Sequence, residues 1–388
     1  MRRFRCVHMS SVHFYSDVRI LRKECRSLAE AGYDVVLIAP CEKDLTVDGI
    51  SVQAVPEVAA RLRRMTQVVW MVYRKAMCNH ADIYHFHDPE LMPIALLLKW
   101  RGKRVIYDVH EDLPRQLVTK DWLPNWSRGL LGYIIERLET WAAGKLDGIV
   151  TATPTIARRF PANKTYIIYN YPRIEEFNIN DASSYADRPA SVTYVGGISW
   201  LRGIKEMMLA VSLLPAEANV RLKVAGWYDV PGFESELPSI PGYDRTDILG
   251  CLSREGVADL LSQVRVGLVV IHPTENYIDS LPVKLFEYMA AGIPVIASDF
   301  PLWREIVDSA TCGLLVDPLD PRAIADAIQW LLDHPDEAAE MGRRGREAVL
   351  TRFNWKSEEQ KLLSIYRELL CGADASADKT KSHAVVDS

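Results

Sequence analysis

Short apolar runs alternate with stretches of helical period along most of this chain, and this alternation restricts the fold more than any other feature. In the first half, runs typical of buried strands lie at residues 4–9, 35–39, 83–86, 104–109 and 148–151. Helical spacing lies between them, as in the apolar residues from Val18 to Ala29 that precede Gly32, and across residues 58–79. Strands separated by helices predict a parallel sheet with βαβ crossovers, so we expect an α/β fold.

The alternation stops and then begins again. Residues 174–189 are polar, rich in Asn, Asp and Ser, and show no period. After them, strands are predicted at 191–195, 221–225, 266–271 and 294–297, with helices at 203–214, 254–263 and 282–291 and another that begins at Asp320-Pro321. In a chain of 388 residues, this predicts two tandem domains, 1–170 and 171–352.

The end of the chain is predicted to be a helix and a tail. Trp355, Leu362, Tyr366, Leu369 and Leu370 form one apolar stripe, which predicts a helix over 353–371. Residues 372–388 are small and polar, and we expect a flexible tail there.

Composition excludes several classes of protein. Apolar residues make up 48% of the chain and charged residues 25%, which is typical of a globular protein. The longest apolar run, residues 91–98, is too short to span a membrane, and no signal-peptide core follows the basic N-terminus. The seven cysteines are odd in number and contain no CxxC, so neither a disulfide framework nor a structural zinc site is expected. We therefore expect a cytoplasmic protein.

Charge is distributed unevenly. Residues 1–170 hold 25 Lys and Arg against 18 Asp and Glu, a balance of +7, whereas residues 171–388 have a balance of −12. Basic residues at 61, 63, 64, 74 and 75 lie near Trp70 and Tyr73. This grouping predicts an anionic acceptor or a peripheral contact with the inner face of an anionic membrane, and no nucleic acid. The alternative is a solvated basic helix face.

The strongest local pattern is DSLPVKLFEYMAAGIP at residues 279–294. Pro282 suits the first turn of a helix, and Asp279 or Ser280 could cap it. The N–H groups of such a turn bind anions, and Lys284 adds a cation one turn further on. Glu287 could accept hydrogen bonds from a ribose diol. The alternative is a capped helix with a surface Lys284–Glu287 pair.

This stretch resembles the E-x7-E region of the family-4 retaining glycosyltransferases, which have the GT-B fold. In that motif, two acids eight residues apart precede a run such as EYMAAGxPVxAS. Asp279 takes the first position, one methylene shorter than Glu, and Glu287 takes the second. The resemblance implies two Rossmann-like domains that face each other across a cleft, with the final helix crossing back to the first domain.

A second part of the resemblance lies after the strand at 191–195. Gly196-Gly197 followed by Arg202-Gly203 is similar to the family's turn with two basic residues, but Gly197 stands where the first basic residue is usual. We expect Lys284 to replace it. A tight turn would explain the two glycines equally well. The resemblance implies a donor site formed by Gly196, Gly197, Arg202, Gly250, Ser280, Leu281, Pro282, Val283, Lys284 and Glu287.

The first domain contains two clusters of His and acidic residues at strand ends, HFHDPE at 85–90 and YDVHED at 107–112. His85 and His87 share one face of a strand, whereas the residues at 86 and 88 point the other way, so a metal site is not favoured. The second cluster resembles the DVHE stretch of one branch of the family, in which the His lies beside the donor sugar. His110 is therefore a candidate catalytic residue, and the alternative is a buried His bonded to a carboxylate.

The loop after the first strand, residues 10–16, differs from the glycine-rich turn of many family members because it contains no glycine. We expect it to shape the acceptor side, without a role for each residue. The continuation at residues 17–24 does resemble the same branch of the family.

Taken with the resemblance, these residues imply a retaining, metal-independent hexosyltransferase that uses a nucleotide sugar, with UDP-sugar the usual donor of the family. Arg202, Lys284, Asp279 and His110 are the expected catalytic residues, and polysaccharide, glycolipid or other glycoconjugate is the expected acceptor. Two alternatives are a nucleotide-sugar 2-epimerase of the same fold and a non-catalytic sugar-nucleotide-binding protein. A Rossmann dehydrogenase is disfavoured because no GxGxxG follows the first strand.

Overall fold

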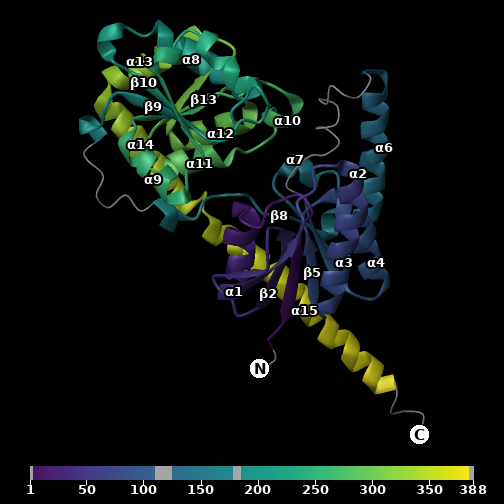
Figure 1. Cartoon of the computed structure of the whole chain (residues 1–388). Helices are drawn as coiled ribbons and strands as arrows, with labels where there is room; N and C mark the ends of the chain where they lie inside the picture. Colours follow the sequence, from purple (N-terminus) through teal and green to yellow (C-terminus); the bar gives the residue numbers. More distant parts are fainter. Residues whose placement is uncertain (1–2, 110–124, 178–184, 384–388) are drawn as a thin grey trace. The chain divides into compact units, whose positions relative to one another are not determined.

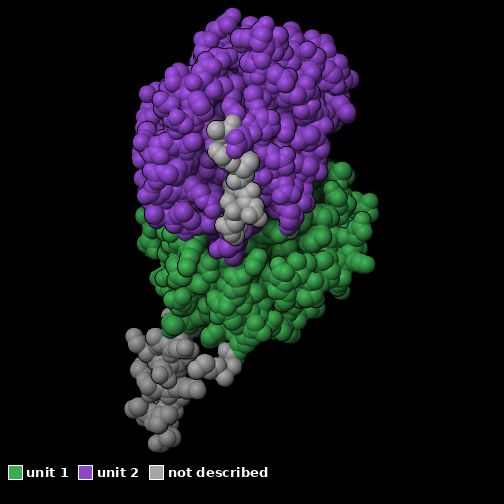
Figure 2. Space-filling view, turned by 90° about the vertical axis from the view of Figure 1, so that its left-hand side faces the viewer, with its two compact units in different colours: residues 1–170, 356–388 green, residues 171–355 purple. Residues whose placement is uncertain are grey.

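Each half of the chain builds its own β-sheet in the computed structural model, which describes residues 3–109, 125–177 and 185–383 (Figure 1). The first unit contains Met1–Asn170 and Lys356–Ser388, and the second contains Tyr171–Trp355 (Figure 2). The predicted α/β fold with two Rossmann-like parallel-sheet domains is confirmed.

The sheet of unit 1 has eight strands in the order β3-β4-β2-β1-β5-β6-β7-β8, and all neighbours are parallel except β3 and β4. The strands are β1 (Arg5–Met9), β2 (Asp34–Pro40), β3 (Leu45–Val47), β4 (Ile50–Val55), β5 (Ile83–Phe86), β6 (Arg104–Val109), β7 (Gly148–Thr151) and β8 (Thr165–Ile167). Strand β1 is central, with Val7 opposite Val36 of β2 and Tyr84 of β5.

The helical elements of unit 1 cover both faces of this sheet (Figure 1). They are η1 (Val18–Cys25), a π-helical segment, α1 (Arg26–Glu30), α2 (Arg61–Arg63), η2 (Arg64–Val68), α3 (Val69–Cys78), η3 (Pro89–Leu91), α4 (Met92–Trp100), α6 (Asn125–Ala143), α7 (Pro154–Ala157), η4 (Ala162–Lys164) and α15 (Trp355–His383). Because side chains alternate along a strand, β5 sends Tyr84 and Phe86 into the apolar core with α3 and α4, and His85 toward α15.

The sheet of unit 2 has six parallel strands in the order β11-β10-β9-β12-β13-β14. They are β9 (Ser191–Val195), β10 (Arg221–Ala225), β11 (Thr246–Gly250), β12 (Val266–Val269), β13 (Val295–Ser298) and β14 (Gly313–Val316). The α-helices are α8 (Ile204–Leu213), α9 (Arg254–Gln263), α10 (Glu275–Ile278), α11 (Val283–Ala290), α12 (Pro301–Ala310), α13 (Pro321–Asp333) and α14 (Pro335–Thr351). The short 3₁₀ turns are η5 (Ile174–Phe177), η6 (Tyr185–Asp187), η7 (Trp200–Arg202), η8 (Ala216–Ala218), η9 (Phe233–Ser235), η10 (Leu237–Ser239) and η11 (Tyr243–Arg245).

Helix α11 lies close against this sheet. A Cβ atom at Gly267 of β12 would lie 2.2 Å from the ring of Tyr288, so only glycine leaves room for the helix. The Tyr288 hydroxyl also accepts a hydrogen bond from the Val195 amide at the end of β9, at 2.8 Å. These contacts hold α11 against β9 and β12.

The structure differs from the predicted tail. Helix α15 continues to His383, past Gly372, where a flexible tail was expected. Three Ala and two Lys among residues 373–382 favour a helix, although the other five residues there are Asp, Ser and Thr, which favour it less. Within the described part of the chain, no helix combines the length and the hydropathy that a membrane-spanning segment needs.

Candidate functional site

The start of α11 is not capped as predicted. Pro282 occupies the N-cap position and makes no side-chain capping hydrogen bond. Asp279 instead ends α10, where its amide donates to the Tyr277 carbonyl, and the Ser280 hydroxyl donates to the same carbonyl at 3.0 Å. The prediction that Asp279 or Ser280 caps the helix is wrong, because both residues complete the preceding turn. The positive end of the helix dipole therefore lies at Val283, directly after Pro282.

Lys284 is buried within unit 2, and its ammonium lies over the ring of Tyr194, 3.6 Å from the centroid. Its Nζ atom has no hydrogen-bond partner in the described part of the chain. Burial, and then the nearby charge of Arg202, hold the pKa of Lys284 well below its usual value. A buried cation without a hydrogen-bond acceptor is costly, and an incoming anion would remove that cost.

Gly196 is required where it stands. Its φ is +135°, and a Cβ atom there would lie 2.8 Å from the Lys284 ammonium. The turns after β9, β10 and β11 also contact each other, since Gly226 donates to the Gly250 carbonyl at 2.8 Å and a Cβ atom at Gly226 would lie 1.8 Å from the Gly196 carbonyl oxygen. Gly250 itself has φ +67°. Bare backbone therefore lines this edge of the sheet beside Lys284, where a diphosphate can approach closely.

Arg202 ends the turn η7 near the same glycines. Its guanidinium lies 4.9 Å from the ring centroid of Tyr277, and its Nε atom is 3.8 Å from a carboxylate oxygen of Asp229. A Cβ atom at Gly197 would lie 2.3 Å from Asp229 Oδ1, so this carboxylate fills the space beside Gly197. No motif in the sequence indicates Asp229. Its position just beyond the carboxyl end of β10 is the only signal, because ligand-binding residues of parallel sheets lie at such strand ends.

Glu287 is buried one turn after Lys284, but the two do not form the surface pair considered as an alternative. The Glu287 carboxylate pairs instead with Arg254 of α9, at 2.7 Å, and Arg254 pairs at 2.5 Å with Glu176 of η5. Burial alone would lower the pKa of Arg254, but the two carboxylates outweigh it and raise the pKa. The pattern alone did not reveal Arg254 or Glu176, because they are distant from Glu287 in the sequence.

Leu281 links α10 to α11, and the Ser280 carbonyl beside it accepts a hydrogen bond from the Trp303 indole at 2.6 Å. The predicted donor-site residues at 196, 197, 202, 250, 280–284 and 287 all belong to unit 2. His110 lies outside the described residues.

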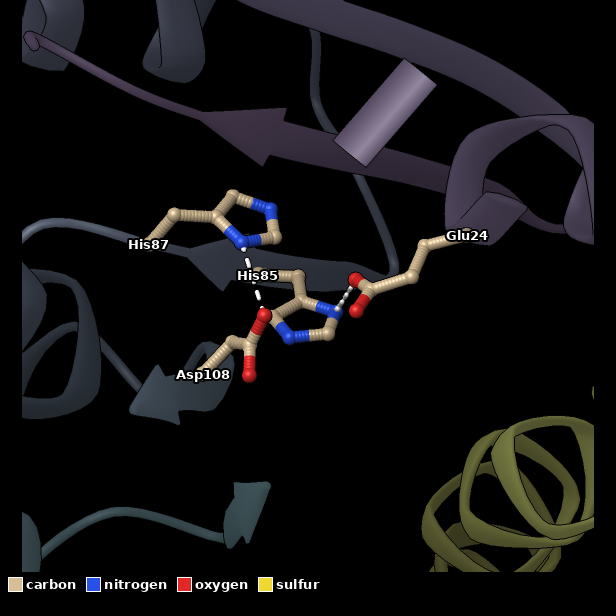
Figure 3. A group of neighbouring side chains, drawn as sticks. All are labelled: Glu24, His85, His87 and Asp108. Atoms are coloured by element: carbon tan, nitrogen blue, oxygen red, sulfur yellow. Dashed lines mark hydrogen bonds and ion pairs between the residues drawn. The ribbon is translucent and has the colours of Figure 1, made fainter. Parts of the chain in front are cut away.

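In unit 1, the predicted strand-end residues join a buried polar network under α15 (Figure 3). Asp108 accepts two hydrogen bonds from Arg19, each at 2.9 Å, and lies 3.1 Å from His87 Nδ1. The Tyr366 hydroxyl of α15 is bonded to His85 at 2.9 Å. The network therefore holds α15 to the sheet.

Four members of this network, Glu24, His85, His87 and Asp108, have side-chain donor atoms within 4.8 Å of one another, a spacing that a metal ion could use. The guanidinium of Arg19 already lies 3.1 Å from Glu24 and 2.9 Å from Asp108 and supplies a cation there. Burial, and then the charge of Asp108, raise the pKa of Glu24 well above its usual value. Burial therefore disfavours the charged form of Glu24, and the Arg19 guanidinium already supplies a cation to this group of residues.

The glycine-free loop after β1 is organised by Asp88. One oxygen of its carboxylate accepts hydrogen bonds from the Ser10 hydroxyl at 2.7 Å and from the amides of Ser11 and Val12 at 2.6 and 3.2 Å. The side chain therefore satisfies the turn amides, and no glycine is needed for this turn.

Two family models match the chain. The model of Glycosyltransferase Family 4 matches residues 18–171, and the model of Glycosyl transferases group 1 matches residues 176–348. Together these ranges include nearly all of both sheets and the whole of the site in unit 2.

Curated relatives show moderate identity. The alpha-D-kanosaminyltransferase of Streptomyces kanamyceticus is 26% identical over 185 residues, 47% of this chain and 46% of that protein. The phosphatidyl-myo-inositol mannosyltransferase of Mycobacterium leprae is 23% identical over 352 residues, 86% of this chain and 88% of that protein. The chain thus matches less than half the length of the first relative. Both relatives are glycosyltransferases, so the epimerase alternative is not favoured.

Solved structures share the fold. Sucrose-phosphate synthase from Thermosynechococcus elongatus has a TM-score of 0.76 and 21% identity, and the match covers 95% of this chain and 100% of that chain. The Anabaena protein Alr3699/HepE in complex with UDP-glucose has a TM-score of 0.72 and 13% identity, and the match covers 94% of this chain and 99% of that chain.

Proposed function

The chain belongs to the group 1, or family 4, glycosyltransferases with the GT-B fold, and on that premise we propose that it transfers a sugar from a UDP-sugar to an acceptor in the biosynthesis of a polysaccharide, glycolipid or other glycoconjugate. The observation that carries the proposal is Lys284, a buried cation without a hydrogen-bond acceptor beside an uncapped helix start and Gly196. The UDP-glucose complex of the structurally similar Anabaena protein supports the choice of donor.

The donor diphosphate would be neutralised by groups of the protein. When the sugar leaves, negative charge builds on the β-phosphate, and Lys284, Arg202 and the amides at the start of α11 are the donors that would stabilise it. With these cations in place, the reaction would need no divalent metal ion. The transfer would retain the anomeric configuration by a front-face route, in which the leaving phosphate helps to deprotonate the acceptor.

Glu287 is proposed to hold the ribose hydroxyls of the donor. Arg254 pairs with one oxygen of its carboxylate and fixes its orientation, and the other oxygen would accept a hydrogen bond from a ribose hydroxyl. Asp279 and His110 keep the proposed role near the donor sugar that the resemblance implies.

The acceptor is proposed to be a sugar or a lipid-linked sugar, met at the inner face of an anionic membrane. The structure shows which of the basic side chains at residues 61–75 are exposed and could contact a membrane. Arg63 is exposed, but Arg64 pairs with the carboxylate of Glu90 at 2.9 Å, so part of its positive charge is neutralised within the protein. The basic residues before Trp70 therefore offer less charge to a membrane than their number predicts.

The proposal is tested first by binding. A panel of nucleotide sugars is screened by thermal unfolding, and a donor at about 100 times its Kd is expected to stabilise the protein by about 2.7 kcal/mol. Glu287→Ala is expected to weaken UDP binding roughly tenfold to hundredfold in calorimetry, because a charged hydrogen-bond acceptor is lost. Glu305→Ala, on the exposed side of α12, is the matched control. If no nucleotide sugar or nucleoside diphosphate binds the wild type, the proposal fails.

Transfer itself is measured as donor-dependent release of UDP when glycolipid and oligosaccharide acceptors are added. Release that depends on an acceptor supports transfer. A protein that binds the donor but releases no UDP with any acceptor would instead be the non-catalytic binding protein.

A further inference from the structure

Helix α6 exposes a continuous apolar stripe on unit 1. Its members recur every three or four residues, so they lie on one face of the helix. Their exposed fractions lie between 44% and 60%, and they are Leu130, Tyr133, Ile134, Leu138 and Trp141. Apolar side chains gathered in this way mark a surface that another molecule covers.

The opposite side of α6 is fixed to the unit. Glu139 accepts a hydrogen bond from the buried Tyr107 hydroxyl at 2.7 Å and pairs with Arg159. Ala142 and Ala143 belong to the apolar core. The helix therefore cannot rotate its stripe inward without breaking these contacts. In Figure 1, α6 stands on the outer side of unit 1, near α4.

Cations accompany the stripe. The exposed side chains of Arg137 and Lys145 lie over its aromatic rings, with the Arg137 guanidinium 5.1 Å from the ring centroid of Tyr133 and the Lys145 ammonium 5.8 Å from that of Trp141. Glu136, an acid on the same part of the helix, lies 3.6 Å from Arg159. On α4, which contacts α6, the last residue Trp100 is 82% exposed, and the guanidinium of Arg101 lies 5.6 Å from the ring centroid of Tyr73.

We propose that α6 is the element by which this protein lies on an anionic lipid surface, with the apolar stripe in the acyl boundary and its cations at the headgroups. Aromatic rings with Arg and Lys around an apolar face are the composition that suits a bilayer interface. The cations favour an anionic bilayer over a second copy of the chain, which would bring the same cations to the interface. The inference rests on the proposed membrane contact and assigns it to α6 in place of the basic residues at 61–75.

The test is flotation with vesicles of phosphatidylcholine alone or mixed equally with phosphatidylglycerol. The full-length protein is expected to float with the mixed vesicles, less so as salt is raised. The double variant Leu138→Glu/Trp141→Glu should lose at least roughly tenfold in bound fraction, since each apolar side chain withheld from lipid weakens binding by about that factor. Leu319→Glu, at an exposed leucine of unit 2, is the matched control and should float like the wild type.

A second measurement separates insertion from attraction by charge alone. Brominated lipid should quench the fluorescence of Trp141. Because the chain has 10 tryptophans, this part of the quenching is identified by its loss in Trp141→Phe. Quenching that is the same in this variant and in the wild type would overturn the insertion of α6. The proposal also fails if the wild-type protein does not bind mixed vesicles at low salt. It fails too if the protein does not float but forms a dimer that Leu138→Glu dissociates, because the stripe would then be a contact between two copies of the chain.

The same preparations are tested for UDP binding by thermal unfolding. A double variant that unfolds like the wild type and still binds UDP shows that loss of flotation comes from the stripe. Failure of UDP binding in a wild type that floats would refute the proposed donor site and leave the α6 surface standing.

Discussion

Replacing Lys284 by Met should strengthen the fold and weaken donor binding in the same protein. The ammonium is buried, has no hydrogen-bond acceptor in the described part of the chain, and gains mainly its contact with the Tyr194 ring. Burying one ion costs several kcal/mol, and a desolvated cation–π contact returns about 2 kcal/mol. Met has nearly the same shape without the charge, so Lys284→Met should raise the free energy of unfolding by about 1–3 kcal/mol.

The gain should depend on pH in a definite direction. Lysine in the unfolded chain ionises at about pH 10.4, and the folded pKa of Lys284 is lower. Above the unfolded pKa the side chain is neutral in both states, so the penalty is absent. As the pH falls, the unfolded chain takes up a proton that the folded protein resists, and the wild type loses stability. The advantage of Lys284→Met should therefore be present near pH 7 and shrink as the pH is raised toward about 10.

Urea unfolding near both pH values and calorimetry with UDP provide the measurements. UDP affinity should fall roughly tenfold to hundredfold, because a charge-assisted hydrogen bond to phosphate is lost. Lys205→Met is the control, since this exposed lysine also lies over a ring, that of Trp200 at 5.8 Å, yet should change neither quantity. A less stable Lys284→Met protein, or one with unchanged UDP affinity, would refute the assignment of Lys284 as a strained phosphate ligand.

Three further outcomes are expected. Arg254→Gln should lower the free energy of unfolding in urea titrations by about 3 kcal/mol, because the buried Glu287 loses its charged partner. Adding Glu287→Gln to this variant should restore most of the lost stability, and additive losses from the two changes would contradict an interaction between the two residues. Asp229→Asn should tighten UDP binding roughly twofold to tenfold in calorimetry, since a carboxylate near Arg202 repels the diphosphate; weaker binding would assign Asp229 to the donor sugar. Transfer and UDP binding should survive EDTA, because Arg202 and Lys284 supply the charge; activity abolished by EDTA and restored by Mg²⁺ would reject the proposed metal-free mechanism.

The alternation of the sequence predicted nine of the described strands and missed five, β3, β4, β8, β11 and β14. Strand β4 lies inside the first sheet, but its residues alternate between buried and more exposed, so it lacks a continuous apolar run. The other four are short edge strands with mixed exposure; β3, β8 and β11 contain polar residues, and the four residues of β14 are apolar but too few to indicate a strand by themselves. Helix α6 also escaped prediction. It is apolar on its exposed stripe as well as on its buried side, which blurs the single-face period that indicates a helix.

The family motif predicted which residues of the donor site belong together, and the comparisons confirm the family and the fold. It could not predict the partners of those residues. Asp229 and Arg254 come from other strands and helices, and their distance from the motif in the sequence carries no signal of contact. The capping of α11 was misjudged for a related reason, since Asp279 can end one turn as readily as it can begin the next.

The sequence by itself determined the two-sheet architecture, because the period of apolar residues is a local property of the chain. It also determined which residue types stand in the donor motif. Only the tertiary structure decided their physical state. Lys205 of α8 and Lys284 of α11 are the same residue type in unit 2, but the side chain of Lys205 is exposed and that of Lys284 is buried against the ring of Tyr194. Burial follows from how distant segments pack, so the fold, and not the pattern, buries Lys284 and holds its pKa below the usual value.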